Sequence, residues 1–356
     1  MKIGLIGSPK SGKTTIFNAL SKSNAEVSAF ESMKTEPNIA IVDVRDERVT
    51  KLIEMYKPAK SMYAKIELVD FVGVKKDETK KEELFSPELM RLVKTMDSLA
   101  VVLRNFTSEL TGAIDAAPDL GKIEEELLLS DLIITEKRIE RIAASSKGGQ
   151  TAALAAEDKV LQKVLGQLNA MKPVRDLSLS ADEQKTIRGF QFLTQKPLFL
   201  VLNSDEEHFK KDPSLVDSLT KRYRTIECAG SFEMELSRLS DETEIKAFMD
   251  DMGINESARD RLTVCAHETL GLISFFTVGE DEVRAWELVR NSTAVDAAGA
   301  IHTDLARGFI RAECFSYADL MECGSEKGVK DKGKFRMEGK DYIVKDGDIL
   351  SIRFNV

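Results

Sequence analysis

The chain has 356 residues, of which 42% are hydrophobic and 31% are charged. Such a mixture is typical of a globular protein with two or three domains, and it excludes a disordered, collagen-like or membrane-embedded chain. The 51 basic and 60 acidic side chains give a formal net charge of −9. That charge excludes a general nucleic-acid coat, so we expect no DNA partner and allow RNA contact only through a local basic patch.

We expect neither a membrane partner nor a secretory leader. No apolar run reaches the roughly 18 residues of a membrane span, and the apolar run at the N-terminus is broken by Gly7 and Pro9. The four cysteines stand far apart without paired spacing, which favours reduced thiols over a structural zinc site. These features predict a cytoplasmic protein.

The pattern at the N-terminus predicts a strand over residues 1–6, a glycine-rich turn, and a helix over residues 14–23. Later strands are continuous apolar runs, which are typical of parallel strands covered on both faces. Strands that alternate with helices predict a doubly wound α/β sheet. The later strands are expected at Ala64–Val69, Ser98–Leu103 and Pro197–Leu202, with Thr225–Cys228 as a weaker candidate.

Between about residues 119 and 193 the pattern changes to long helices. Leucine and isoleucine recur there at helical spacing on both sides of the polar segment Ser145–Thr151. This spacing predicts two antiparallel helices paired as a short coiled coil. Ser180 and Glu183 have the spacing of a capping box, which predicts the start of a further helix.

The C-terminal residues form short apolar runs separated by turn signals, which predicts a small β-rich domain. The segment Lys345–Asp348 has the composition of a hairpin turn before the last strand. The four runs are Ile273–Val278, Val283–Val289, Phe309–Phe315 and Ile349–Phe354.

Residues Gly7 to Thr14 fit the phosphate-loop pattern G-x-x-x-x-G-K-S/T, between a predicted strand and a predicted helix. In such a loop, backbone amides and the helix N-terminus bind phosphate oxygens. Lys13 would place its ammonium between the β- and γ-phosphates and is the candidate catalytic residue, while the Thr14 hydroxyl would bind Mg²⁺. The predicted nucleotide-binding residues of this loop are Ser8, Pro9, Lys10, Ser11, Gly12, Lys13, Thr14 and Thr15.

Two further motifs follow predicted strands. Asp70 and Gly73 form a D-x-x-G pattern, in which the aspartate binds Mg²⁺ through water and the glycine amide meets the γ-phosphate. Asn203, Ser204 and Glu206 occupy the place of the guanine-reading motif N-K-x-D, with serine for lysine and glutamate for aspartate. They are candidate base-contacting residues with an altered preference, and an exposed polar loop is the alternative.

Four C-terminal segments carry long motifs: Phe275–Trp286, Ala297–Asp304, Arg307–Glu313 and Gly339–Asp348. These segments resemble the TGS domain of the YchF family, the Obg-like ATPases within the translation-factor class of P-loop GTPases. Thr35 lies in a segment that resembles switch I of this family, which implies that Thr35 supplies a second hydroxyl ligand for Mg²⁺. The motif at Asn203–Glu206 resembles the family's altered base-reading motif, which implies ATP in preference to GTP.

The resemblance covers essentially the whole chain and implies three parts. They are a P-loop G domain at 1–118 and 194–272, a helical coiled-coil insert at 119–193, and a ubiquitin-like β-grasp TGS domain at 273–356. It also implies a partner linked to the ribosome or to translation. The residues themselves give little support for RNA contact, because the locally basic segment Gly328–Arg336 is more typical of a solvated loop.

The chain departs from the family pattern at the phosphate loop. Lys10 and Ser11 stand where the family usually has asparagine and valine. In related enzymes that asparagine helps to hold K⁺ near the phosphates. Two alternatives follow: the Lys10 ammonium takes the place of K⁺, or it points to solvent and K⁺ is not used.

The chain also departs at the positions expected to support hydrolysis. Val74 occupies the place of a catalytic glutamine in Ras-like enzymes, and Val101 matches the place of the histidine that the family is thought to use. Neither side chain has a polar atom to orient water. Three functions therefore stay open: a slow ATPase that acts as a switch, a nucleotide-gated binding protein with little hydrolysis, and a GTP-specific enzyme.

Overall fold

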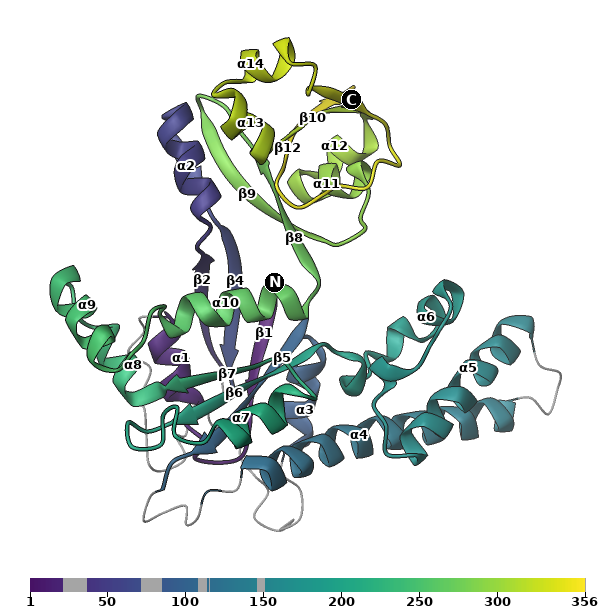
Figure 1. Ribbon diagram of the computed structural model, residues 1–356. Coiled ribbons are helices and arrows are strands. Elements are labelled where there is room, and N and C mark those ends of the chain that lie inside the picture. The colour runs from purple at the N-terminus through teal and green to yellow at the C-terminus, as the bar shows by residue number, and fades with distance from the viewer. Residues whose placement is uncertain (22–36, 72–84, 108–113, 115, 146–150, 356) are drawn as a thin grey trace. The chain divides into compact units, whose positions relative to one another are not determined.

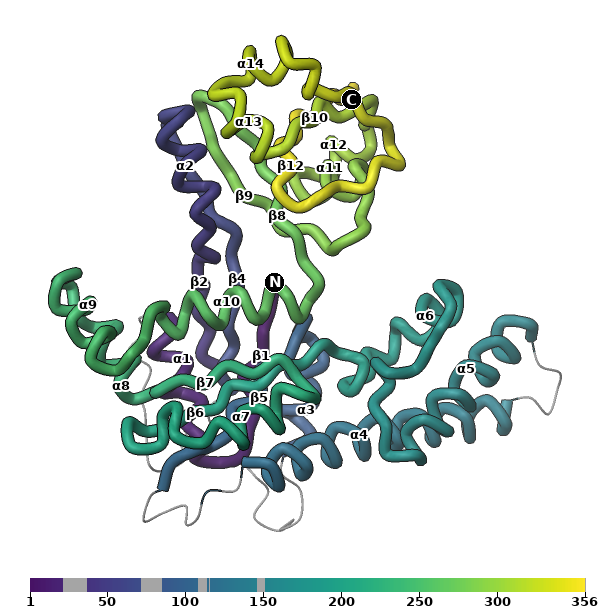
Figure 2. The backbone as a smooth tube through the Cα atoms, in the orientation of Figure 1, coloured from purple at the N-terminus to yellow at the C-terminus, as the bar shows by residue number. Residues whose placement is uncertain are grey.

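The computed structural model describes residues 1–21, 37–71, 85–107, 114, 116–145 and 151–355 (Figure 1). The chain divides into two compact units. One combines Met1–Ile41 with Glu67–Arg261, and the other combines Val42–Ile66 with Leu262–Val356. The three-part division made from the sequence remains a prediction; it places residues 42–66 in the P-loop domain, whereas the contacts group them with the C-terminal residues. The backbone path can be followed in Figure 2.

A six-stranded sheet forms the centre of the first unit, and the strands β4, β1, β5, β6 and β7 run parallel in that order. The five strands predicted in this region are confirmed, while the edge strand β2 was not predicted. In sheet order the strands are β2 (Asn38–Val44), β4 (Ala64–Asp70), β1 (Lys2–Ile6), β5 (Ser98–Asn105), β6 (Leu198–Ser204) and β7 (Thr225–Ala229).

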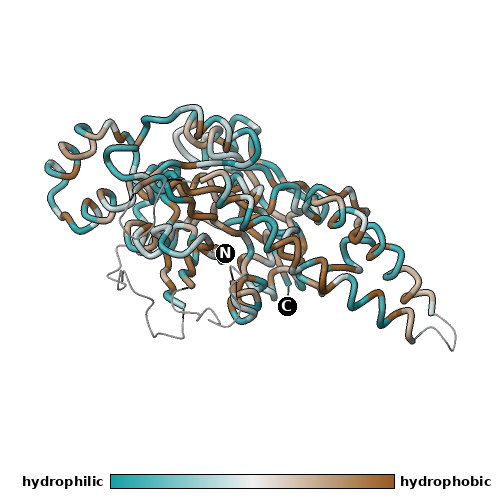
Figure 3. The backbone as a smooth tube through the Cα atoms, turned by 90° about the horizontal axis from the view of Figure 1, so that it is seen from below, coloured by the Kyte–Doolittle hydropathy of each residue, from teal (hydrophilic) through white to brown (hydrophobic). Residues whose placement is uncertain are grey.

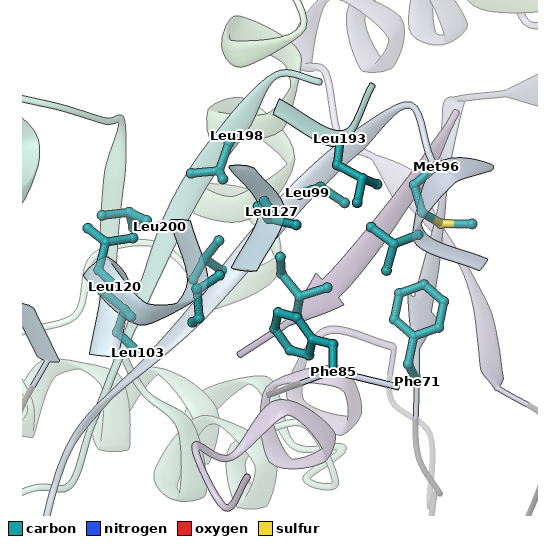
Figure 4. Packing of buried hydrophobic residues seen from close by; sticks show 14 of the residues in the cluster. Phe71, Phe85, Met96, Leu99, Leu103, Leu120, Leu127, Leu193, Leu198 and Leu200 are labelled. Atoms are coloured by element: carbon teal, nitrogen blue, oxygen red, sulfur yellow. The ribbon is translucent and has the colours of Figure 1, made fainter. Parts of the chain in front are cut away.

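Helices cover both faces of this sheet. Leu99, Val101 and Leu103 of β5 pack into one hydrophobic cluster with residues of α3, α4 and α7, and Figure 4 shows the labelled leucines pointing toward one another. Ala100 and Val102 alternate with them and are equally buried, so the opposite face is covered as well. The helices of this unit are α1 (Lys13–Ser21), α3 (Pro87–Lys94), α4 (Ala116–Ser145), α5 (Ala152–Asn169), α6 (Ala181–Ile187), α7 (Pro213–Thr220), α8 (Gly230–Leu236) and α9 (Glu242–Asp251).

The predicted helical pair is α4 and α5, which lie side by side in Figures 1 and 2. Leu128 and Leu161 belong to a hydrophobic cluster of their own, and Arg138 of α4 donates to Glu157 of α5 at 2.7 Å. The predicted capping box is confirmed, because the Ser180 hydroxyl accepts from the Glu183 amide at the start of α6. Short 3-10 turns at Val174–Asp176, Arg188–Phe190 and Leu193–Gln195 lead back toward β6.

The second unit contains a mixed six-stranded sheet in the order β11, β10, β12, β8, β9, β3. β8 pairs antiparallel with β9 and parallel with β12, and α11 packs on this sheet, as predicted for a β-grasp domain. The strands are β3 (Lys60–Met62), β8 (Leu272–Thr277), β9 (Glu282–Val289), β10 (Phe309–Ser316), β11 (Arg336–Glu338) and β12 (Asp348–Phe354). The helices are α2 (Glu47–Tyr56), α11 (Ala294–Ile301), α12 (Thr303–Arg307), α13 (Tyr317–Cys323) and α14 (Glu326–Asp331), and α10 (Ala258–Thr269) precedes β8.

Hydrophobic residues run through the strands of the first sheet, while hydrophilic residues are frequent on the surrounding helices (Figure 3). Among the helices that the structure describes, none combines the length and the apolar character needed to cross a bilayer.

Candidate nucleotide-binding site

Two glycines shape the loop between β1 and α1. A Cβ atom on Gly7 would lie 2.4 Å from the carbonyl oxygen of Val102, and one on Gly12 would lie 2.0 Å from Nδ2 of Asn203. Gly12 also has φ of +87°, in the left-handed region that favours glycine. The loop can therefore lie close against the ends of β5 and β6 only because these positions carry no side chain.

The Lys13 ammonium folds back over the phosphate loop. Its Nζ donates to the carbonyl oxygens of Gly7 at 3.0 Å and Ser8 at 2.9 Å. Burial lowers the pKa of Lys13 to about 8, and the nearby Asp70 carboxylate opposes this change. Added negative charge would favour the protonated ammonium, so a phosphate group suits this position better than the two neutral carbonyls do.

The other predicted loop residues are arranged around Lys13. Pro9 and Lys10 are exposed, and Lys10 has φ of 62°. Ser11 is 2% exposed, and its Oγ finds no hydrogen-bond partner among the described residues. Ser8 and Thr15 are half-buried, at the start of the loop and in the first turn of α1.

Thr14 and Asp70 meet beside Lys13. Thr14 Oγ1 donates to Asp70 Oδ2 at 2.8 Å, and Asp70 is completely buried with its Oδ1 unpartnered among the described residues. Burial raises the pKa of Asp70, against the hydrogen bond from Thr14, the charge of Lys13 and a hydrogen bond from Asn38. An orphaned carboxylate oxygen next to a hydroxyl is a donor set that suits Mg²⁺, because this ion prefers oxygen ligands. The other two predicted partners, Thr35 and Gly73, lie outside the described residues.

Asn203 joins the phosphate loop to the end of β7. Its Nδ2 donates to the carbonyl oxygen of Ser11 at 3.0 Å, and its Oδ1 accepts from the amide of Gly230 at 3.2 Å. A Cβ on Gly230 would lie 2.3 Å from that Oδ1, so the side chain is held between two glycine positions. Gly230 was not predicted from the sequence. Its place directly after the weakly predicted strand β7, which neighbours β6, is the feature that could have indicated it.

Ser204 and Glu206 do not join Asn203 on the same face. Side chains alternate along a strand, so the Ser204 side chain points to the opposite face of the sheet, where it is 2% exposed. Its Oγ donates to Glu227 at 2.7 Å and accepts from Asn105 at 2.9 Å. Glu206 is exposed in the turn after β6. Asn105 and Glu227 were also missed in the sequence, because a polar residue in a strand gives no signal of its partner.

Of the two positions expected to orient water, Val101 is described by the structure and Val74 is not. Val101 is fully buried in the hydrophobic cluster between β5 and the helices α3 and α4. A valine in that environment offers no polar atom to a water molecule. Val74 lies outside the described residues.

A parallel sheet with a glycine-rich loop, a lysine and a threonine at the start of the first helix defines the chain as a P-loop nucleotide-binding protein. A family model described as "50S ribosome-binding GTPase" matches residues 2–138, in agreement with this class. A second model, for the C-terminal region of YchF GTPases and described as a protein of unknown function (DUF933), matches residues 272–355.

Relatives that match along the whole chain identify the family. The ribosome-binding ATPase YchF of Escherichia coli O157:H7 is 38% identical over 364 residues, which cover 100% of this chain and 99% of that protein. The protein of the same name from Bacillus subtilis is 35% identical, with 99% of each covered. The structure of the Schizosaccharomyces pombe YchF GTPase superposes with a TM-score of 0.85 at 30% identity, covering 99% of this chain and 97% of that one. The chain therefore belongs to the YchF family, as the sequence motifs indicated.

Proposed function

We propose that the chain binds ATP with Mg²⁺ in the cytoplasm and hydrolyses it slowly, as a switch linked to the ribosome. The observation that carries this proposal is the arrangement of Lys13, Thr14 and Asp70 around the phosphate loop, with Asn203 beside it. The relatives named ribosome-binding ATPase YchF support both the nucleotide and the partner. The altered motif at Asn203–Glu206 supports ATP over GTP.

In this proposal, Lys13 exchanges its two carbonyl partners for oxygens of the β- and γ-phosphates. The amides at residues 10–14 and the N-terminus of α1 add donors and positive potential. Thr14 and Asp70 would hold Mg²⁺, and the ion would supply positive charge that neutralises part of the phosphate charge. Charge stabilisation by fixed donors is then the main catalytic contribution of this chain.

A binding protein with little hydrolysis is the second candidate, and the buried Val101 is the observation that favours it. Phosphate release from ATP, compared between the wild type and Lys13→Ala, separates the two. Slow release that the variant abolishes supports the ATPase. Release at the same rate in both proteins leaves the binding function and refutes hydrolysis.

Competition between ATP and GTP for the same site tests the base preference, and a tenfold preference corresponds to about 1.4 kcal/mol. If GTP displaces a bound nucleotide more strongly than ATP does, the chain is a GTP-binding protein in which Glu206 accepts hydrogen bonds from guanine.

The basic segment Gly328–Arg336 gives the ribosomal partner no independent support. Lys334 pairs with Asp319 at 2.8 Å and with Glu322 at 2.7 Å, and Lys332 pairs with the same Glu322 at 3.3 Å. Much of the positive charge is therefore neutralised within the chain. Co-sedimentation of the full chain with ribosomes, with and without ATP, tests this part of the proposal.

A further inference from the structure

A line of hydrogen bonds crosses the ends of three neighbouring strands on the face opposite Asn203. Asn105 is the last residue of β5, Ser204 is the last residue of β6, and these two are register partners. Asn105 Nδ2 donates to Ser204 Oγ at 2.9 Å, and Ser204 Oγ donates to Glu227 Oε1 of β7 at 2.7 Å. Two consecutive hydrogen bonds thus link the three side chains.

The same oxygen of Glu227 also accepts from the backbone amide of Lys210 at 3.1 Å. Ser204 and Lys210 are the two ends of the turn that carries Glu206, so one carboxylate oxygen holds both ends of this turn. Lys210 has φ of 59°, a left-handed conformation that is uncommon for residues other than glycine. The turn also has bonds of its own, since the Asp205 side chain accepts from the His208 amide at 2.9 Å. Glu227 adds the bonds that join the two ends of the turn to β7.

Removal of the Glu227 carboxylate would affect hydrogen-bonding groups that have little access to other partners. Ser204 is 2% exposed and Asn105 is 4% exposed, so neither can exchange its partner freely for water. A buried donor without an acceptor is costly, and hydrogen bonds to a charged acceptor are stronger than neutral ones. The two ends of the turn would then lose their shared acceptor, while the phosphate loop, which contacts Asn203 on the opposite face, would keep its own bonds.

We propose that Glu227 is a positioning residue for base recognition: it ties together the two ends of the turn between Ser204 and Lys210, and so holds Glu206, which lies in this turn, in one place. This inference rests on the proposed function, since it assigns Glu227 to the base end of the same nucleotide site. Glu227 acts on base recognition only through Ser204 and Lys210, which it holds by hydrogen bonds.

The test measures the affinity of the full chain for ATP, GTP and inorganic tripolyphosphate, each with Mg²⁺. In Glu227→Ala, ATP affinity is expected to fall about tenfold and the ATP preference over GTP to disappear, as the loss of one or two hydrogen bonds to a charged acceptor predicts. Tripolyphosphate, which has no base, should bind as in the wild type. Glu227→Gln should behave like the wild type, because its amide oxygen still accepts from Ser204 and Lys210.

Glu207→Ala, in the same turn and exposed, is the matched control and should change none of the three affinities. If Glu227→Ala does not fold, Glu227→Asp takes its place, because its shorter side chain cannot reach both donors. Unchanged affinities for ATP and GTP in the folded variant overturn the inference. An equal loss of affinity for ATP and for tripolyphosphate also overturns it, and so does a wild type that binds ATP and GTP with equal affinity. A wild type that binds none of the three ligands refutes the proposed function itself.

Discussion

Arg48 of α2 donates from Nη1 to Asp346 Oδ2 at 2.7 Å, although 298 residues separate them in the chain. The same guanidinium binds the Asp46 side chain, which caps α2, and lies over the Phe276 ring at 5.0 Å. At the other end of α2, the Tyr56 hydroxyl donates to Glu326 at 2.8 Å. Residues 42–66 are thus an integral part of the C-terminal unit.

Substitution of Arg48 by alanine should destabilise this unit. Arg48 and Asp346 are 27% and 50% exposed, so solvent screens the ion pair, and most of the loss comes from the contact with the Phe276 ring. We expect the free energy of unfolding to fall by about 1–2 kcal/mol. Arg45→Ala, at an exposed position just before α2, is the control for thermal or urea unfolding. Equal stability of the two variants would contradict a structural role of Arg48.

The pH dependence of stability should report the same contact. Burial by itself would raise the pKa of Asp346, but the hydrogen bonds from Arg48 and the Ser274 amide, with the charge of Arg48, lower it overall. A carboxylate with a lowered pKa stabilises the folded state at neutral pH, and this contribution is lost as the pH falls through the folded-state pKa. The stability difference between the wild type and Asp346→Asn should therefore be fully present above about pH 5 and decline as the pH falls below about 4, toward the lowered folded-state pKa. A difference that does not change as the pH falls through this range would show that Asp346 is not an ionised partner.

Much of the first unit could be predicted from the sequence because its strands are buried on both faces. Runs such as Leu198–Leu202 are apolar at every position, and the phosphate loop has a fixed residue pattern. The place of α2 and β3 could not be predicted, since it depends on partners such as Asp346 that are remote in the chain. The side chain of Glu227 was missed for the same reason: its role follows from register between β6 and β7, which a single sequence does not contain.

A buried carboxylate connects the helical pair to the sheet. Asp131 of α4 is completely buried and accepts from the amides of Leu193 and Thr194 at 2.9 and 2.7 Å, just before β6. Asp131→Ala leaves these donors buried without an acceptor, so we expect a loss of about 2–4 kcal/mol in the free energy of unfolding. Glu136→Ala, at an exposed position of α4, should have little effect in the same urea titration. A loss below 1 kcal/mol, roughly, would mean that water reaches the freed donors.

The exposed Lys10 leads to a prediction about monovalent cations. The residue has no side-chain oxygen to bind K⁺, in contrast to the asparagine usual in the family, so nucleotide hydrolysis should proceed equally in KCl and NaCl. Lys10→Asn restores an amide oxygen at this position and should introduce stimulation by K⁺. The measurement is phosphate release at matched ionic strength in the two salts. Strong stimulation of the wild type by K⁺ would contradict both roles considered for Lys10.

The central claim is that the phosphate loop, with Lys13, binds the triphosphate of a purine nucleotide. Isothermal titration calorimetry with ATP and GTP in the presence of Mg²⁺, on the wild type and on Lys13→Ala, tests it most directly. The account predicts saturable heat with ATP for the wild type and at least about tenfold weaker binding for the variant. Absence of heat with either nucleotide for the folded wild type would contradict it.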